Sequence, residues 1–161
     1  MDMHEIRFAV EDLLHAYAHC IDSDNLEEWP SFFTEDCLYK VIPRENTDQG
    51  LPIAVMYCDS QGMLKDRVVA HRKANLYAPH FYRHLVSNIR ITGQQNGVIA
   101  AHSHYVVFRT LADPLQYGTT EVYSTGEYRD KIVVAPGRSQ FTEKIVIVDT
   151  CRISSLLVTP L

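Results

Sequence analysis

The stretch Arg83-His84-Leu85-Val86-Ser87-Asn88-Ile89-Arg90-Ile91 begins the half of the chain in which the hydrophobic pattern changes to a period of two. This period places successive side chains on opposite faces of an extended segment and is typical of strands. Turn signals such as Asn96-Gly97 and Pro136-Gly137 separate the apolar segments. We therefore expect a largely antiparallel meander, with strands at residues 84–91, 100–111, 119–129, 141–148 and 151–158.

The first half of the chain has helical spacing instead. Residues 4–21 predict an amphipathic helix, because its apolar residues fall on one stripe of a helical wheel. A second helix is expected after the Asp59-Ser60 cap. Between them we expect a short helix at 25–29, strands at 37–42 and 52–58, and a loop at 44–50. Helices followed by strands indicate a single α+β domain over residues 1–161, with helices packed on one face of a curved sheet.

Composition and charge exclude several classes of partner. The formal net charge of −5, without a cluster of Lys and Arg, argues against nucleic acid. No apolar run reaches the ~20 residues that span a bilayer, and Met1 to Glu5 lack a signal-peptide pattern. We therefore expect a cytoplasmic protein without a membrane partner. The cysteines lack zinc or iron–sulfur spacing, which predicts free thiols and no metal site at Cys20, Cys37, Cys58 and Cys151.

A second stripe on the first helix suggests a surface for a partner. Phe8, Asp12, His15 and His19 follow one another at spacings of four, three and four residues, opposite the apolar stripe. An aromatic ring within a polar stripe is a good anchor for another protein. The alternative is a single exposed phenylalanine, which is common in soluble proteins.

The strands also suggest contact with another subunit. Apolar residues occupy both faces of the strand at 100–111, with Tyr105 and Val107 on one face and Val106 and Phe108 on the other. Helices that cover only one side of the sheet would leave one of these sets exposed, so we expect Tyr105 and Val107 at an interface. The segment Tyr82-Arg83-His84 is a further interface candidate, with a local salt bridge as the alternative.

A catalytic alternative rests on His19, Asp22 and Tyr17. Such a group offers a general acid and base within a pocket. The helical wheel places His19 about 180° from Tyr17, however, and so away from the expected core. We expect no catalytic residue in this chain and keep this constellation as the alternative.

Two segments carry a resemblance to known proteins. The run from Tyr17 through Asp24 to Trp29, followed by Phe32 to Cys37 and Tyr39, resembles the opening of nuclear-transport-factor-like (cystatin-like) cone folds. The more specific stretch is residues 83–91, preceded by a strand, an Asp-Ser turn and a helix. This order resembles the small (beta) subunits of aromatic-ring-hydroxylating dioxygenases, nearest to the salicylate-hydroxylase, anthranilate and related aromatic-acid branch.

The resemblance implies a division of labour between subunits. In that family a large (alpha) subunit carries a Rieske [2Fe–2S] cluster and a mononuclear Fe(II), fed by a ferredoxin and a reductase. Three large and three small subunits form the usual assembly. The present chain lacks the Cys-x-His and Cys-x-x-His ligands of a Rieske centre. It is thus expected to be the non-catalytic small subunit, without a cofactor or metal; the alternative is an autonomous cone-fold dehydratase or isomerase.

Overall fold

A mixed sheet forms the body of the protein in the computed structural model, which describes residues 1–74, 79–112, 118–149 and 159–161. Its strands lie in the order β2-β1-β6-β5-β4-β3. Neighbours pair antiparallel except β1 and β6, which pair in parallel. The strands are β1 Phe33–Pro43, β2 Met56–Cys58, β3 His80–Gln95, β4 Val98–Leu111, β5 Thr120–Ala135 and β6 Arg138–Val148. The expected α+β cone with a largely antiparallel mixed sheet is confirmed, while the strand expected at 151–158 lies outside the described residues.

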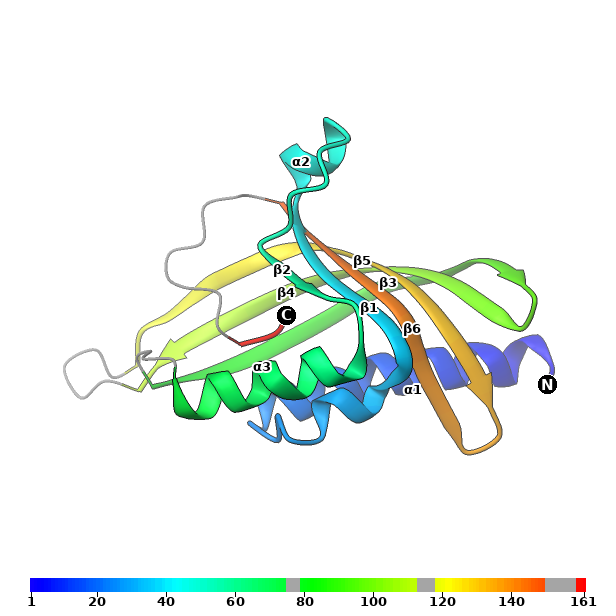
Figure 1. Cartoon of the computed structure of the whole chain (residues 1–161), viewed down its shortest axis with the longest axis horizontal. Coiled ribbons are helices and arrows are strands. Elements are labelled where there is room, and N and C mark those ends of the chain that lie inside the picture. The colour runs from blue at the N-terminus through cyan, green and yellow to red at the C-terminus, as the bar shows by residue number, and fades with distance from the viewer. Residues whose placement is uncertain (75–78, 113–117, 150–158) are drawn as a thin grey trace.

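Two long helices cover the inner face of the curved sheet (Figure 1). Helix α1, Met3–Asp22, packs against β3, and helix α3, Gln61–Lys73, packs against β1. Both helices bury their apolar residues in the same core cluster. The shorter elements are the 3-10 helix η1, Trp29–Phe32, and helix α2, Arg44–Asp48.

Local chemistry explains where the long helices begin. Asp2 and Glu5 form a capping box at the start of α1, in which each carboxylate accepts the other residue's backbone N–H at 2.8 and 2.7 Å. Ser60 caps α3 by accepting from the Met63 N–H. Both helices therefore begin close to the positions that the sequence predicts.

Three local predictions were wrong. The short helix expected at 25–29 is a series of turns, and the helical hydrogen bonding starts only at η1. The loop expected at 44–50 contains α2, because Pro43 has an extended backbone and leaves a helical turn to follow it. The strand expected at 52–58 is confined to the three residues of β2, since only these pair with β1.

The hairpin turns follow the predicted chemistry. Asn96 and Gly97 both have positive φ angles, of 51° and 79°, as the turn between β3 and β4 requires. The strands run further into these turns than the sequence analysis predicts, so β3 reaches Gln95 and β5 reaches Ala135. The end of β3 is polar and is held by backbone pairing, which leaves no trace in side-chain hydrophobicity. The end of β5 is apolar, from Ile132 to Ala135, and the prediction stopped short of it.

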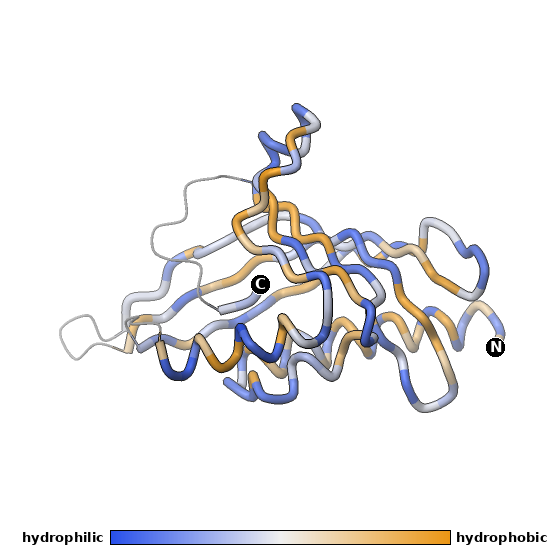
Figure 2. The backbone as a smooth tube through the Cα atoms, viewed as in Figure 1, coloured by the Kyte–Doolittle hydropathy of each residue, from blue (hydrophilic) through white to orange (hydrophobic). Residues whose placement is uncertain are grey.

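A cluster of aromatic rings lies within the core. Figure 2 shows hydrophobic residues concentrated along the central strands and recurring along α1. Five fully buried rings pack with neighbouring centroids 5.1 to 6.2 Å apart, most of them edge to face. They belong to Tyr17, Trp29, Phe33, Tyr39 and Phe141.

Candidate functional site

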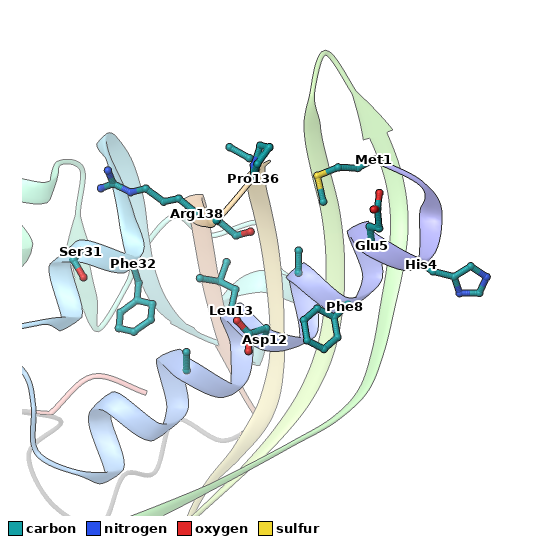
Figure 3. A pocket seen from close by; sticks show the side chains of 15 residues that line it. Met1, His4, Glu5, Phe8, Asp12, Leu13, Ser31, Phe32, Pro136 and Arg138 are labelled. Carbon is teal, nitrogen blue, oxygen red and sulfur yellow. The ribbon is translucent and has the colours of Figure 1, made fainter.

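A large surface hollow lies beside α1. It measures about 1050 Å³ and runs between α1, η1 and the turn that joins β5 to β6. Phe8 and Leu13 line it from the helix, and Phe32 and Pro136 line it from the other elements (Figure 3). Asp12, Glu5 and Arg138 add charges to this apolar groove, which we call the Phe8 groove.

Phe8 is unusually exposed for an aromatic residue, at 71%. Its position on the second stripe of the first helix agrees with the sequence-based assignment, and Asp12 of the same stripe also lines the groove. His15 and His19 are exposed on α1 but do not line it. The groove thus has the apolar centre and polar rim that are typical of protein–protein contact surfaces.

A second apolar surface lies on part of the outer face of the sheet. Leu85 is 58% exposed and lies opposite Val106 in the β3–β4 register. Phe108 lies opposite Val122, which is 58% exposed, in the β4–β5 register. Directly opposed residues share a face, so these four side chains form one patch, which we call the outer-face patch. Arg83, exposed and opposite Phe108, lies at its edge.

Four of the residues expected at an interface are instead in the core. Tyr105 and Val107 are fully buried, and Tyr82 and His84 are buried beside them. The expectation for β4 chose the wrong face: Tyr105 and Val107 face the helices, whereas Val106 and Phe108 face outward. The sequence holds a signal for this choice further along the strand, because the polar His102 and His104 lie on the same face as Val106 and Phe108. Of the expected interface residues, Phe8, His15, His19 and Arg83 remain exposed.

The catalytic alternative is not assembled. Tyr17 is fully buried, and its hydroxyl donates to the carbonyl oxygen of Leu161 at 2.7 Å. His19 is exposed and lies 3.4 Å from the Ser23 hydroxyl. The Asp22 carboxylate contacts His84 instead. His19, Asp22 and Tyr17 therefore do not form one acid–base site.

Asp22 pairs with His84 across 62 residues of sequence. One carboxylate oxygen accepts from His84 Nδ1 at 2.6 Å, and the other accepts from the His84 backbone N–H at 2.8 Å. His84 Nε2 is buried and has no hydrogen-bond partner among the described residues. The pair fastens the end of α1 to β3; sequence reasoning missed it because the two residues meet only in the folded chain.

A buried ion pair lies deeper in the cone. Lys144 Nζ donates to both oxygens of Asp130, at 3.2 and 3.4 Å, and neither side chain is exposed. The ammonium group also lies 3.6 Å from the centroid of Tyr128 and 4.6 Å from that of Tyr17. Burial raises the pKa of Asp130 to about 6, while burial lowers the pKa of Lys144.

Comparison with known proteins identifies the family. The family model described as "Ring hydroxylating beta subunit" matches residues 16–155. The chain belongs to this family. The anthranilate 1,2-dioxygenase small subunit of Burkholderia cepacia is 43% identical over 154 residues, which cover 96% of this chain and 93% of that protein. A terephthalate 1,2-dioxygenase beta subunit of Comamonas sp is 39% identical, over 91% of this chain and 92% of its own.

Solved structures show the same fold. The beta subunit of a putative aromatic-ring-hydroxylating dioxygenase from Novosphingobium aromaticivorans DSM 12444 is 46% identical, with a TM-score of 0.87 over 99% of this chain and all of its own. A putative scytalone dehydratase from the same organism has a TM-score of 0.67 at 18% identity, over 92% of this chain and 86% of its own. The second likeness shows the cone fold alone.

Histidine, cysteine and acidic side chains are the groups that could hold a metal ion in this chain. Within residues 1–74, 79–112, 118–149 and 159–161, no three His, Cys, Asp or Glu side chains lie close enough to hold a metal ion. His102 and His104 are both exposed on β4, and the His104 ring lies 3.0 Å from the Asn88 side-chain amide. No helix of the described residues is long and apolar enough to cross a membrane.

Proposed function

We propose that this chain is the small, non-catalytic subunit of a multicomponent Rieske oxygenase that hydroxylates an aromatic acid. The family match over residues 16–155 carries the proposal. The two relatives named above belong to dioxygenases for anthranilate and terephthalate, both of which are aromatic acids. They support the class of substrate; salicylate, the example that the family resemblance suggests, is one member of that class.

In this proposal the metal chemistry belongs to a large subunit. That subunit would hold the Rieske [2Fe–2S] cluster and the mononuclear Fe(II), and would receive electrons from a ferredoxin and a reductase. The present chain would act as one domain over residues 1–161 in a cytoplasmic assembly of three large and three small subunits. It would offer contact surfaces on a rigid fold, which is stabilised by the aromatic cluster in the core and by the hydrogen bonds between Asp22 of α1 and His84 of β3.

Two separate apolar surfaces support an assembly with more than one kind of neighbour. The outer-face patch lies on β3, β4 and β5, whereas the Phe8 groove lies between α1, η1 and the β5–β6 turn. A small subunit in a ring of three large and three small subunits contacts both kinds of chain. We therefore assign these surfaces, rather than the buried Tyr105 and Val107, to the contacts with large and other small subunits.

The autonomous dehydratase or isomerase has less support. Its proposed base, His19, is exposed on the outside of α1, and Tyr17 is engaged with Leu161 inside the core. The relatives that share 38% to 43% of the sequence are oxygenase subunits.

Reconstitution with the large subunit of the oxygenase tests the proposal. We expect the purified large subunit, ferredoxin and reductase to hydroxylate the aromatic acid efficiently only when this chain is present, and this chain alone to have no oxygenase activity. Full activity and unchanged assembly of the large subunit in its absence would refute the supporting role.

Surface variants test where the contacts lie. Phe8→Glu and Leu85→Glu each place a charge on one apolar surface without disturbing the core, so each is expected to weaken assembly measured by gel filtration. Leu51→Glu is the matched control, because Leu51 is also exposed but belongs to neither surface. Normal assembly of both surface variants would remove these surfaces from the proposal and leave family membership unaffected.

A further inference from the structure

Strand β3 forms one edge of the sheet. Among the described residues it pairs only with β4, and β2 forms the other edge. The backbone N–H and C=O groups on the free side of an edge strand can pair with a strand from another chain. At 16 residues, β3 offers a much longer edge than the three residues of β2. The fold must therefore either block the free side of β3 or leave it to a partner.

The fold blocks the first half of this edge. Asp22 of α1 accepts the backbone N–H of His84 at 2.8 Å, and Arg83 Nη1 donates to the Tyr82 carbonyl oxygen at 2.7 Å. Between Phe81 and Gln95, these are the only hydrogen bonds from described side chains to the backbone of β3. A charged side chain on an edge strand hinders pairing with another strand. The edge at residues 82–84 is therefore closed.

The second half of the edge carries no such side-chain bonds among the described residues. It begins after a bulge, where Asn88 has a φ angle of 54° and the register with β4 shifts between Ser87 and Arg90. Beyond the bulge β3 continues to Gln95. Residues 90–95, which we call the open edge, have about the length of a typical strand of ~5–6 residues.

A groove of about 220 Å³ lies between α1 and β3 beside the open edge. Figure 1 shows the start of α1 and the β3–β4 hairpin at the same end of the molecule. The groove is lined by Met3, Arg7 and Val10 of α1 and by Ile89, Arg90 and Ile91 of β3. Its two charged residues are both arginines. Arg7 bridges to Glu11 at 2.8 Å, whereas the exposed Arg90 has no ion pair within the part of the chain that the structure describes. The groove thus combines apolar walls with an uncompensated positive charge.

We propose that an extended segment of the large subunit adds a strand to the open edge, with apolar side chains in the groove and a carboxylate beside Arg90. In binding of this kind, main-chain hydrogen bonds give affinity and pockets for alternate side chains give specificity. The inference rests on the proposed function, because it names a contact within the same assembly. It adds a third contact, since the groove shares no residue with the Phe8 groove or the outer-face patch.

The charges of the groove distinguish the large subunit from a second copy of this chain. Two open edges that paired around a twofold axis would bring the arginines of both grooves together. Like charges that face each other across paired strands are destabilising. An extended segment with a carboxylate instead meets the opposite charge at Arg90. The closed edge at residues 82–84 limits the length of such a segment, because it cannot pair beyond the bulge.

Hydrogen exchange followed by mass spectrometry tests the backbone pairing. It compares the free chain with the complex that forms when the chain is co-expressed with the large subunit. We expect residues 90–95 to exchange about tenfold more slowly in the complex, because N–H groups on the free side of β3 become hydrogen-bonded. Residues 44–50 belong to no proposed contact and are the control segment, which should exchange at the same rate in both samples.

Charge reversal tests the carboxylate. Arg90→Glu should raise the apparent dissociation constant for the large subunit about tenfold, because attraction becomes repulsion. Arg90→Gln removes the charge alone and should have a smaller effect in the same direction. Lys65→Glu is the matched control: it makes the same charge change at an exposed position of α3 outside the groove and should bind as the unsubstituted chain does. Circular dichroism checks the fold of each variant.

The outcomes separate this proposal from the function on which it rests. A complex in which residues 90–95 exchange as fast as in the free chain would overturn the strand pairing and leave the supporting role intact. Equal binding of Arg90→Glu and Lys65→Glu would overturn the acidic segment. Exchange that slows at residues 90–95 when the chain alone is concentrated would identify a second copy at this edge, and would overturn the proposal too. If no complex with the large subunit forms, the proposed function and this inference both fail.

Discussion

The buried pair of Asp130 and Lys144 gives the most demanding prediction about stability. Lys144→Met keeps an unbranched side chain of similar length but removes the ammonium group that contacts both carboxylate oxygens. Removing one partner of a buried ion pair costs about 3–5 kcal/mol, because the other charge stays in the core uncompensated. Since the free energy of unfolding of a domain is about 5–15 kcal/mol, this is a large share of it.

The effect of Lys144→Met should depend on pH. The folded-state pKa of Asp130, about 6, lies above its ordinary value of 3.8. The stability linked to its protonation is therefore fully present below about 3.8 and is lost as the pH rises through about 6. Lys144 lowers the pKa of Asp130, so in Lys144→Met this pKa should rise further and the stability should continue to fall up to a higher pH. We expect the destabilisation to be smaller at pH 5 than at pH 8.

Urea unfolding of the chain, followed by the fluorescence of its single tryptophan, Trp29, measures this effect. With a denaturant dependence of about 2 kcal/mol per molar urea, a cost of ~3–5 kcal/mol lowers the midpoint by roughly 1.5–2.5 M. The double variant Asp130→Leu with Lys144→Met removes both charges and should regain or exceed the original stability. A midpoint for Lys144→Met within about 0.5 M of the original at pH 8 would refute the reasoning.

Three further predictions concern other contacts. Gly126→Ala should prevent normal folding, because its Cβ would lie 2.0 Å from the Ile147 carbonyl oxygen, whereas Gly62→Ala, with only Ser60 Oγ within 4 Å, should be tolerated; thermal melts of both variants compare the two. Asp22→Ala should lower the free energy of unfolding by about 1–3 kcal/mol for each of the two His84 donors that it leaves unpaired. An unchanged midpoint of urea unfolding would show that the pair does not stabilise the fold. Hydrogen bonds from Arg72 lower the pKa of Glu27 to about 2, so the stability that this contact gives the fold should be lost as the pH falls from about 4.5 toward 2. Because the Glu27 side chain is 64% exposed, this loss should stay below about 1 kcal/mol. In Arg72→Met, the melting temperature should no longer show this part of its decrease at acid pH.

The fold was predictable where local chemistry determines it. The apolar stripe of α1 predicts the residues that the helix buries, and Asn96-Gly97 predicts the turn between β3 and β4. The period of two identifies the meander because each strand pairs with the next along the chain. The parallel pairing of β1 with β6 has no such signal, since it joins residues about a hundred positions apart.

The candidate site was predictable only in part. The exposed stripe on α1 identified Phe8, because a helix with one apolar face leaves the opposite face free. The buried face of β4 could have been chosen from the rest of the strand, since the polar His102 and His104 lie on the same face as Val106 and Phe108 and are exposed. Tyr105 and Val107 lie on the opposite face, which packs in the core with α1 and α3.

Native mass spectrometry of this chain co-expressed with the large subunit of its oxygenase is the most direct test of the central claim. We expect a complex with three copies of this 18.4 kDa chain and three large subunits, with iron bound to the large subunit and none to this chain when it is purified alone. A large subunit that forms its complete active assembly without this chain, or a chain that binds iron stoichiometrically on its own, would contradict the account.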